Sequence, residues 1–464
     1  MIEHIGKTPY PVAKFAAVLL FAVSLIIPAP CEDKPSAVQT PVLKKLESPK
    51  VSRENSEKIL KEVWTTVKEK HYDEKMNNVD WDLVYKEHME MLDGCSNQEQ
   101  LVEILNGMVK KLGQSHMHVL SPPNRIEIRA RSMIAKETSD ADKLSDEEKR
   151  QPGDVGLRLC LAEKQIRVLE VKPGSAGEGA GIKTGDMITS INGIMLDPSQ
   201  ETDLPINFIA QSMLLGKPGT ELALEYVNSD NVISKVTLKR KPTGSKWYQL
   251  GVIPASAVCF EYRKLGESIA YVHLSPCFSD QILLFQGILP DLRTQKGLII
   301  DMRNNPGGII LFPNAMGGWL SDKEIFFGSM KTRTANLKIK SNPQEEAFKG
   351  PIAVLIDGGT ASVAEIFSAG LQDSGRASLF GEVTSGACLP SMFMELSMGY
   401  RLQTVTGDFT RANGKAIEKI GVTPDFPVSP LLLDLKAGKD TAIEAAKIWL
   451  LEKFKKEENS TVQQ

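Results

Sequence analysis

Ser362 is the residue whose local sequence best suits a nucleophile. It follows the apolar run Ile352 to Ile356 and a glycine turn, and it opens the apolar-periodic stretch Val363 to Leu371. A serine at such a strand-to-helix turn presents its hydroxyl above the positive end of the helix dipole. The same position suits a helix N-cap, and the local pattern alone favours the cap.

Two glycines after another buried-strand pattern could stabilise a negatively charged intermediate. Gly307 and Gly308 follow the run Gly297 to Asp301. Their backbone N–H groups can approach a substrate carbonyl because glycine has no Cβ, and the N–H of Val363 is a third candidate for the same oxyanion hole. A tight turn after a strand also needs glycine, and the pair considered alone favours that structural interpretation.

The elements that must position these residues divide the chain into several parts. Apolar residues at helical spacing predict a helical unit over 51–123, and the charged run 137–153 reads as an exposed connector. Over 244–456, strand, glycine turn and helix alternate. This alternation predicts an α/β domain with its active-site loops beyond the strand ends.

Between these two parts, residues 154–241 alternate short β-type runs with glycine turns. The segments that carry a further signal are Val171-Lys172-Pro173-Gly174-Ser175-Ala176, Ala180-Gly181-Ile182-Lys183-Thr184-Gly185-Asp186 and Ile191-Asn192-Gly193. This region resembles a PDZ domain. The resemblance implies a module that captures extended peptide ends by strand addition. The expected peptide-binding loop is Gly156, Leu157, Arg158 and Leu159, although an ordinary first strand explains that segment equally well.

Five motifs in the second half of the chain occur together and in order. They are Asp301-Met302-Arg303-Asn304-Asn305-Pro306-Gly307-Gly308, Gly359-Thr360-Ala361-Ser362-Val363-Ala364-Glu365-Ile366, Leu371-Gln372-Asp373, Gly375-Arg376-Ala377 and Gly421-Val422-Thr423-Pro424-Asp425. This combination resembles the C-terminal processing (tail-specific) peptidase family. The resemblance implies a crotonase-like (ClpP-like) α/β peptidase core with an inserted PDZ β-domain, and it favours Ser362 as nucleophile over Ser362 as cap.

The chain departs from that family at the usual catalytic base. The processing peptidases usually pair the serine with a lysine in a Gly-Glu-x-Thr-x-Gly-Lys-Gly segment. This chain reads Gly381 to Cys388 there, with Ala387 at the position of the lysine. Because a methyl group accepts no proton, either another base serves or the site is inactive.

Another base is available in Leu112-Gly113-Gln114-Ser115-His116, which resembles the Ser-His pair of tricorn-like relatives. That resemblance implies a Ser-His-Ser-Glu tetrad with His116 as base, Ser115 beside it and Glu418 completing it. An imidazole can take the hydroxyl proton and return it to the leaving amine. His118 remains a rival base, and Glu418 could equally be a solvated strand residue.

The N-terminus has the pattern of a secretory signal peptide over residues 1–30. Lysines precede the apolar run Phe15 to Ile27, which ends close to Ala29. The run is shorter than the roughly 20 residues of a membrane span, so we expect an exported, periplasmic or extracellular protein. Cys31 as a lipid-bearing N-terminal residue is the weaker alternative.

Composition narrows the function classes. The net charge is -3 and the pI is near 6.2, which give no basic footprint for nucleic acid. No Cys-x-x-Cys or His-Glu-x-x-His motif suggests zinc, so neither a metal nor an organic cofactor is expected. Beyond Cys31, the cysteines are odd in number and widely spread, and a single Cys259–Cys277 disulfide is one option.

Taken together, these patterns predict an exported serine endopeptidase that acts on protein or peptide tails. One alternative is an inactive peptidase-like scaffold that binds peptide tails through its PDZ domain. This hypothesis rests on Ala387 at the position of the usual lysine. A second is a binder of hydrophobic small molecules, because interphotoreceptor retinoid-binding repeats resemble the same core. The sequence leaves open whether the protein forms a homo-oligomer.

Overall fold

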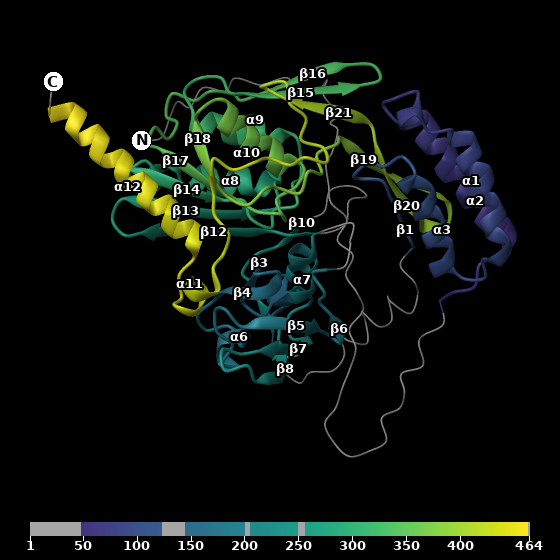
Figure 1. The fold of residues 1–464 in the computed structure, drawn as a ribbon, viewed down its shortest axis with the longest axis horizontal. Helices are drawn as coiled ribbons and strands as arrows, with labels where there is room; N and C mark the ends of the chain where they lie inside the picture. Colours follow the sequence, from purple (N-terminus) through teal and green to yellow (C-terminus); the bar gives the residue numbers. More distant parts are fainter. Residues whose placement is uncertain (1–47, 123–143, 200–204, 249–255, 463–464) are drawn as a thin grey trace, which may run out of the picture.

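The computed structural model describes residues 48–122, 144–199, 205–248 and 256–462. Its described elements form a central α/β body, a β-rich PDZ-like body below it and a helical unit at one side (Figure 1). The predicted signal peptide and Cys31 lie outside the described residues. Within them, no helix is both long and apolar enough to cross a membrane.

The α/β body is built on one mixed sheet. Its strand order is β12-β13-β14-β17-β18-β22, and every neighbouring pair is parallel except β12 with β13. The strands are β12 (Cys259–Leu265), β13 (Ile269–Ser275), β14 (Gly297–Asp301), β17 (Ile352–Ile356), β18 (Ala377–Gly381) and β22 (Phe426–Pro427). Parallel strands place their carboxyl ends at one edge of the sheet, where the loops that carry function gather.

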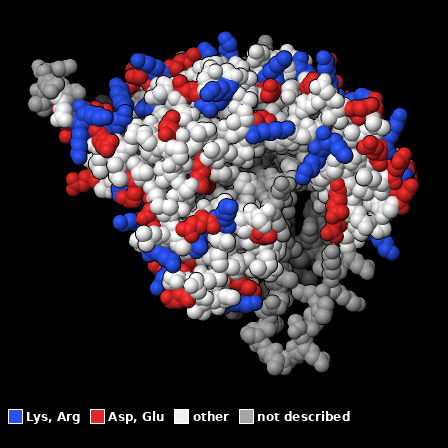
Figure 2. Space-filling view, viewed as in Figure 1, with Lys and Arg blue, Asp and Glu red and all other residues white. Residues whose placement is uncertain are grey.

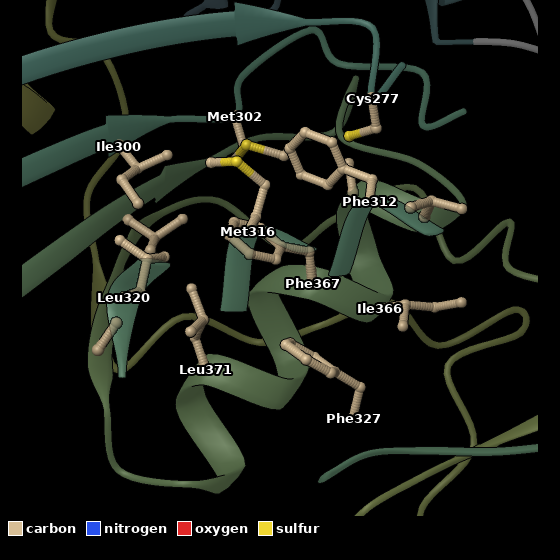
Figure 3. Close-up of a cluster of buried hydrophobic side chains, with 14 of the residues drawn as sticks. Cys277, Ile300, Met302, Phe312, Met316, Leu320, Phe327, Ile366, Phe367 and Leu371 are labelled. Atoms are coloured by element: carbon tan, nitrogen blue, oxygen red, sulfur yellow. The ribbon is translucent and has the colours of Figure 1, made fainter. Parts of the chain in front are cut away.

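Helices cover both faces of this sheet. The helices α8 (Ser279–Leu292), α9 (Leu311–Leu320) and α10 (Val363–Asp373) share one hydrophobic cluster with the sheet, and α12 (Thr441–Val462) shares another. Within β13, Val272 belongs to the first cluster and Tyr271 to the second, as the alternation of side chains along a strand requires. Figure 3 shows the first cluster closing around Met302, Phe312 and Phe367. The predicted α/β fold class is therefore confirmed.

The PDZ-like body is a sheet in the order β3-β4-β5-β7-β8, with β6 paired to β5. Its elements are β3 (Leu157–Ala162), β4 (Gln165–Val171), α6 (Ala176–Gly179), β5 (Met187–Ile191), β6 (Ile194–Met195), α7 (Ile206–Leu214), β7 (Glu221–Val227) and β8 (Ile233–Lys239). β3 is the edge strand, and α7 packs beside it. This is the strand that the sequence placed at the peptide groove.

The helical unit contains a segment that the sequence-based division assigned elsewhere. Its elements are α1 (Arg53–Lys70), α2 (Trp81–Met91), α3 (Gln98–Lys110) and β1 (His118–Leu120). β1 pairs with β20 (Arg401–Val405), which pairs with β19 (Ser391–Glu395). Leu389, Leu402 and Val405 share the hydrophobic cluster of the three helices, so a distant segment completes the core of this unit.

A second small sheet connects the helical unit to the α/β body. It joins β16 (Asn336–Lys340), β15 (Phe326–Thr332) and β21 (Gly407–Arg411). At the turn of the β15–β16 hairpin, Arg333 donates to the carbonyls of Lys68 (2.7 Å) and His71 (2.5 Å) at the end of α1. The hairpin thereby caps α1 and attaches the helical unit to the core.

The remaining elements are short. They are α5 (Asp146–Lys149), β2 (Gly153–Asp154), β9 (Lys241–Pro242), β10 (Trp247–Tyr248), β11 (Ser256–Ala257), α11 (Leu432–Lys436) and the 3₁₀ turns Met76–Asn78, Leu92–Gly94 and Ser397–Gly399. Cys259 and Cys277 both carry free thiols, so the optional disulfide between them is absent. Lys and Arg side chains are mixed with Asp and Glu over the visible face, without a basic stripe (Figure 2).

Candidate active site

Ser362 lies at the turn between β17 and α10, as its sequence context predicts. Its backbone has φ 55° and ψ −126°, a conformation that non-glycine residues rarely adopt. Strained residues of this kind cluster at active sites, where a sharp turn raises a side chain above the surrounding backbone. The turn is anchored from the neighbouring loop, because Ala361 N donates to Asn305 O at 2.9 Å.

The Ser362 side chain does not cap the helix in the way its sequence position allowed. The residue is completely buried, and its Oγ has no hydrogen-bond partner among the described residues. Its backbone N–H instead donates to Ala387 O (2.8 Å) and to Glu365 Oε2 (2.9 Å). A buried hydroxyl without a partner costs free energy, so it calls for a functional explanation.

Glu365 is a site residue that the sequence reasoning missed. Its buried carboxylate accepts hydrogen bonds from the N–H groups of Ser362, Gly386 (2.8 Å) and Ala387 (3.0 Å), and from Thr384 Oγ1 (2.5 Å). Burial raises its pKa to about 7, although the four hydrogen bonds favour the charged form and act to lower the pKa. The Ser-x-x-Glu spacing of Ser362 and Glu365, typical of a capping box, could have revealed it.

Gly307 lies against Ser362, whereas Gly308 lies against the backbone of Cys277. Gly307 has φ 91°, and a Cβ built on it would come within 2.6 Å of Ser362 Cβ. Gly307 N donates to Asn305 Oδ1 at 2.9 Å. In the described part of the chain, Gly308 N and Val363 N donate to no acceptor. The second glycine and the first residue of α10 therefore offer the open N–H groups at this site.

Ser115, His116 and Glu418 meet in a chain of hydrogen bonds. Ser115 Oγ is 2.8 Å from His116 Nδ1 and 2.9 Å from Glu418 Oε2, while Ser115 N donates to Glu418 Oε1 (2.9 Å). Cys388 N donates to Glu418 Oε2 (3.0 Å), and Cys388 directly follows the residue whose carbonyl accepts from Ser362 N. Residues from the helical unit and the α/β body thus meet beside the turn that carries Ser362.

The hydrogen bonds assign the His116 tautomer. A carboxylate can only accept, so the single hydroxyl proton of Ser115 goes to Glu418. Ser115 Oγ must then accept from His116 Nδ1–H, which leaves Nε2 with a free lone pair. Nε2 is buried and has no partner among the described residues. Burial lowers the pKa of His116 to about 3, so the imidazole is neutral near pH 7.

The other histidines have structural positions. His118 lies in β1, opposite Gln403 of β20. His71 is buried and bonded through Nε2 to Gln114 Oε1 at 2.6 Å, and His88 Nδ1 contacts Val84 O. His273 is buried in β13 with Nδ1 3.1 Å from Asp301 O. Asp373 forms an ion pair with Arg411 at 2.6 Å. Within the described residues, no group of three or more His, Cys, Asp or Glu side chains could hold a metal ion.

The predicted peptide loop lies on the edge strand, but Arg158 points to the core. Its guanidinium donates to Asp301 Oδ2 (2.9 Å) and Tyr271 Oη (2.8 Å), so its side chain joins the PDZ-like body to the sheet of the α/β body. Gly156 has φ 77°, and Gly156 O accepts from Lys172 N. Leu157 and Leu159 have buried side chains in the PDZ core. Peptide contacts at this loop must therefore come from backbone groups.

Three family models match separate parts of the chain. They are Peptidase family S41 over residues 268–428, the tricorn protease C1 domain over 52–110 and a PDZ domain over 167–222. These ranges fall on the α/β body, the helical unit and the PDZ-like body. The chain is thus a serine peptidase that combines a family S41 peptidase domain with tricorn C1 and PDZ domains.

The curated relatives share one kind of name. A carboxyl-terminal-processing protease of Synechocystis sp. is 26% identical over 413 residues, covering 84% of this chain and 86% of that protein. The carboxy-terminal processing protease CtpA of Bacillus subtilis is 26% identical over 273 residues, covering 58% of this chain and 55% of that protein. This chain is similar to carboxyl-terminal-processing proteases along most of its length.

Solved structures share the fold. A photosystem II D1 C-terminal processing protease matches with a TM-score of 0.52 and 20% identity, covering 84% of this chain and 99% of that one. Mature CPAF in complex with lactacystin matches with a TM-score of 0.53 and 13% identity, covering 83% and 95%. At these identities the matches establish the fold of this chain.

Proposed function

We propose that the protein is an exported endopeptidase that cleaves peptide bonds with a Ser362, His116, Ser115 and Glu418 tetrad. The observation that carries the proposal is a pair of complementary, buried and unpartnered atoms, Ser362 Oγ and His116 Nε2. One is a proton donor and the other a lone-pair acceptor. Catalytic hydrogen bonds of this kind often form only when substrate is bound.

The chemistry proceeds in two halves. Ser362 Oγ attacks the carbonyl carbon of the scissile peptide bond while His116 Nε2 takes the hydroxyl proton. The N–H groups of Gly308 and Val363 stabilise the oxyanion, and Gly307 keeps the approach free of side-chain atoms. His116 then protonates the leaving amine. Water, deprotonated by the same imidazole, hydrolyses the acyl-enzyme and restores Ser362.

Ser115 and Glu418 are positioning residues for the base. Glu418 fixes the Ser115 hydroxyl as a donor, so Ser115 holds the proton of His116 on Nδ1. The imidazolium that forms during the reaction is stabilised through the same chain of hydrogen bonds. No lysine is needed at position 387, where the backbone of Ala387 serves to bind Ser362 N and Glu365 instead.

The substrates we propose are protein or peptide tails that the PDZ domain presents to the site. The PDZ match and the processing-protease names of the relatives support this assignment. Export rests on the signal-peptide pattern of residues 1–30. The competing proposal, a binding scaffold without activity, rests on Ala387 at the position of the usual lysine.

A fluorophosphonate probe separates the two proposals. Such probes react with activated serines, so the folded wild-type protein should be labelled and Ser362→Ala should not. His116→Ala should lose labelling as well, whereas His118→Ala, the matched control in the adjacent strand, should keep it. A folded wild-type protein that resists labelling would favour the scaffold.

A further inference from the structure

The free edge of the PDZ sheet is occupied by a side chain of the same domain. β3 is the outermost strand, so its outer backbone groups have no strand partner in the described structure. Gln211 of α7 reaches them: Leu159 N donates to Gln211 Oε1 (2.8 Å), and Gln211 Nε2 donates to Leu157 O (3.1 Å). One primary amide therefore satisfies a donor and an acceptor two residues apart.

These two backbone groups are the ones that an added strand would use. Along a strand, the backbone groups that face one edge belong to alternate residues, here Leu157 and Leu159. A peptide bound by strand addition must form its hydrogen bonds with them. The amide of Gln211 offers the same donor and acceptor as a peptide unit. Gln211 and an incoming peptide consequently compete for the same atoms.

The occupied edge is also connected to the candidate active site. Asn304 Nδ2 donates to Leu159 O (3.0 Å), and Asn304 Oδ1 accepts from Asn207 Nδ2 (2.8 Å) on α7. Asn304 belongs to the loop that continues into Gly307 and Gly308. The strand that a peptide would join and the helix that carries Gln211 therefore both contact the loop of the candidate oxyanion hole.

We propose that Gln211 closes the peptide groove of the PDZ domain and must be displaced by an extended, apolar peptide end before that end can bind. The inference rests on the proposed function for its role in substrate entry. The occupant is argued from the free backbone edge of β3 and from the partly buried apolar side chains of Ile206 and Ile209 on α7, the helix that packs beside β3. Displacement exchanges two hydrogen bonds to Gln211 for two to the peptide backbone.

Competition of this kind lowers the apparent affinity by the fraction of molecules in which the groove is open. Removing the amide should therefore tighten peptide binding, whereas a residue that contacts the bound peptide would weaken it when removed. This difference in sign distinguishes a competitor from an ordinary binding residue. It also separates Gln211 from a purely structural residue, whose removal would leave the affinity unchanged or reduce it.

The experiment measures binding by fluorescence polarisation on the full chain with Ser362→Ala, so that no probe is cleaved. The probe is a fluorescein-labelled octapeptide that ends in three valines with a free carboxylate. Gln211→Ala should tighten the dissociation constant by about fivefold or more. Gln165→Ala is the matched control, because Gln165 is exposed at the start of β4 in the same domain. It should leave binding unchanged.

A second variant, Gln211→Leu, keeps the approximate volume on α7 without the amide and should tighten binding to a similar degree. Unchanged or weaker binding by both Gln211 variants, or no probe binding to any of the proteins, would overturn the proposal. Fluorophosphonate labelling of the wild-type chain reports on the peptidase proposal independently. A failure of one proposal can therefore be distinguished from a failure of the other.

Discussion

Ser115 and Glu418 are joined by a hydrogen bond of 2.9 Å although they lie 303 positions apart in the chain. The bond brings together the end of the helical unit and the loop between β21 and β22 of the α/β body. It also determines which nitrogen of His116 carries the proton. In the proposed mechanism, this long-range contact prepares the imidazole to act as the base.

The tetrad predicts a graded loss of activity. His116→Ala should reduce kcat by about 10²- to 10⁴-fold, the usual contribution of a general base. Ser115→Ala and Glu418→Gln should reduce kcat by a smaller factor. Each variant keeps the base and removes only a contact that fixes its tautomer and orientation. Steady-state hydrolysis of a peptide substrate measures these losses. If His118→Ala proves more damaging than His116→Ala, the base has been assigned to the wrong residue.

Activity should fall as the pH drops through about 7, because Glu365 then becomes protonated. A neutral carboxyl loses acceptor capacity for the N–H groups of Ser362 and Ala387, whereas His116, with its pKa near 3, stays neutral. Glu365→Gln should have lower activity and lack this acid limb. The measurement is kcat/KM from roughly pH 5 to 9. An acid limb that persists in Glu365→Gln would assign the titration to another group.

Thermal stability should also depend on the protonation of Glu365, but it should rise as the pH falls, whereas activity should decline. The folded-state pKa of Glu365, about 7, exceeds its ordinary value of 4.5, so between these values the folded state binds the proton and the unfolded state releases it. Lowering the pH through 7 should therefore raise the Tm of the wild type relative to Glu365→Gln. Calorimetry of both proteins across this range tests the sign. A gap in Tm that does not change with pH would contradict it.

A side chain added at Gly307, next to Ser362, should abolish most of the activity. Gly307→Ala places a Cβ within 2.6 Å of Ser362 Cβ at a φ of 91°, so activity should drop by at least about 10²-fold, as when an oxyanion donor is lost. Gly358→Ala is the matched control, since a Cβ there meets no atom within 4 Å. Circular dichroism should show that both variants are folded. Full activity in Gly307→Ala would remove this loop from the mechanism.

The cap that Arg333 provides should matter for both stability and rate. Arg333→Ala removes charged donors from the carbonyls of Lys68 and His71, which should cost about 1 kcal/mol of unfolding free energy at this exposed site. Because the helical unit carries His116, kcat should fall while KM changes little. Lys331→Ala, exposed on the same hairpin, is the control for thermal unfolding and kinetics. Equal kinetics in both variants would show that the hydrogen bonds of Arg333 to the end of α1 do not position His116.

Much of the architecture could be predicted because strand, glycine turn and helix signals are local in the sequence. The position of Ser362 after β17 and of Gly308 after β14 followed from such signals. The contacts of Gln211 with β3 and of Leu402 with the helical unit could not be predicted, because each joins residues far apart in the chain. No periodicity encodes which distant side chain will meet a given backbone group.

The β19–β20 hairpin determines how late in synthesis the core of the helical unit can be completed. Residues 389–405 complete the core around α1, α2 and α3, and Glu418 follows only after them. When Ser362 has just been synthesised, residues 389–405, which complete the core of the helical unit that carries His116, have not yet been added. In the proposed mechanism, hydrolytic competence therefore arises only after Glu418 has been synthesised, so a shorter nascent chain that already contains Ser362 should be inactive.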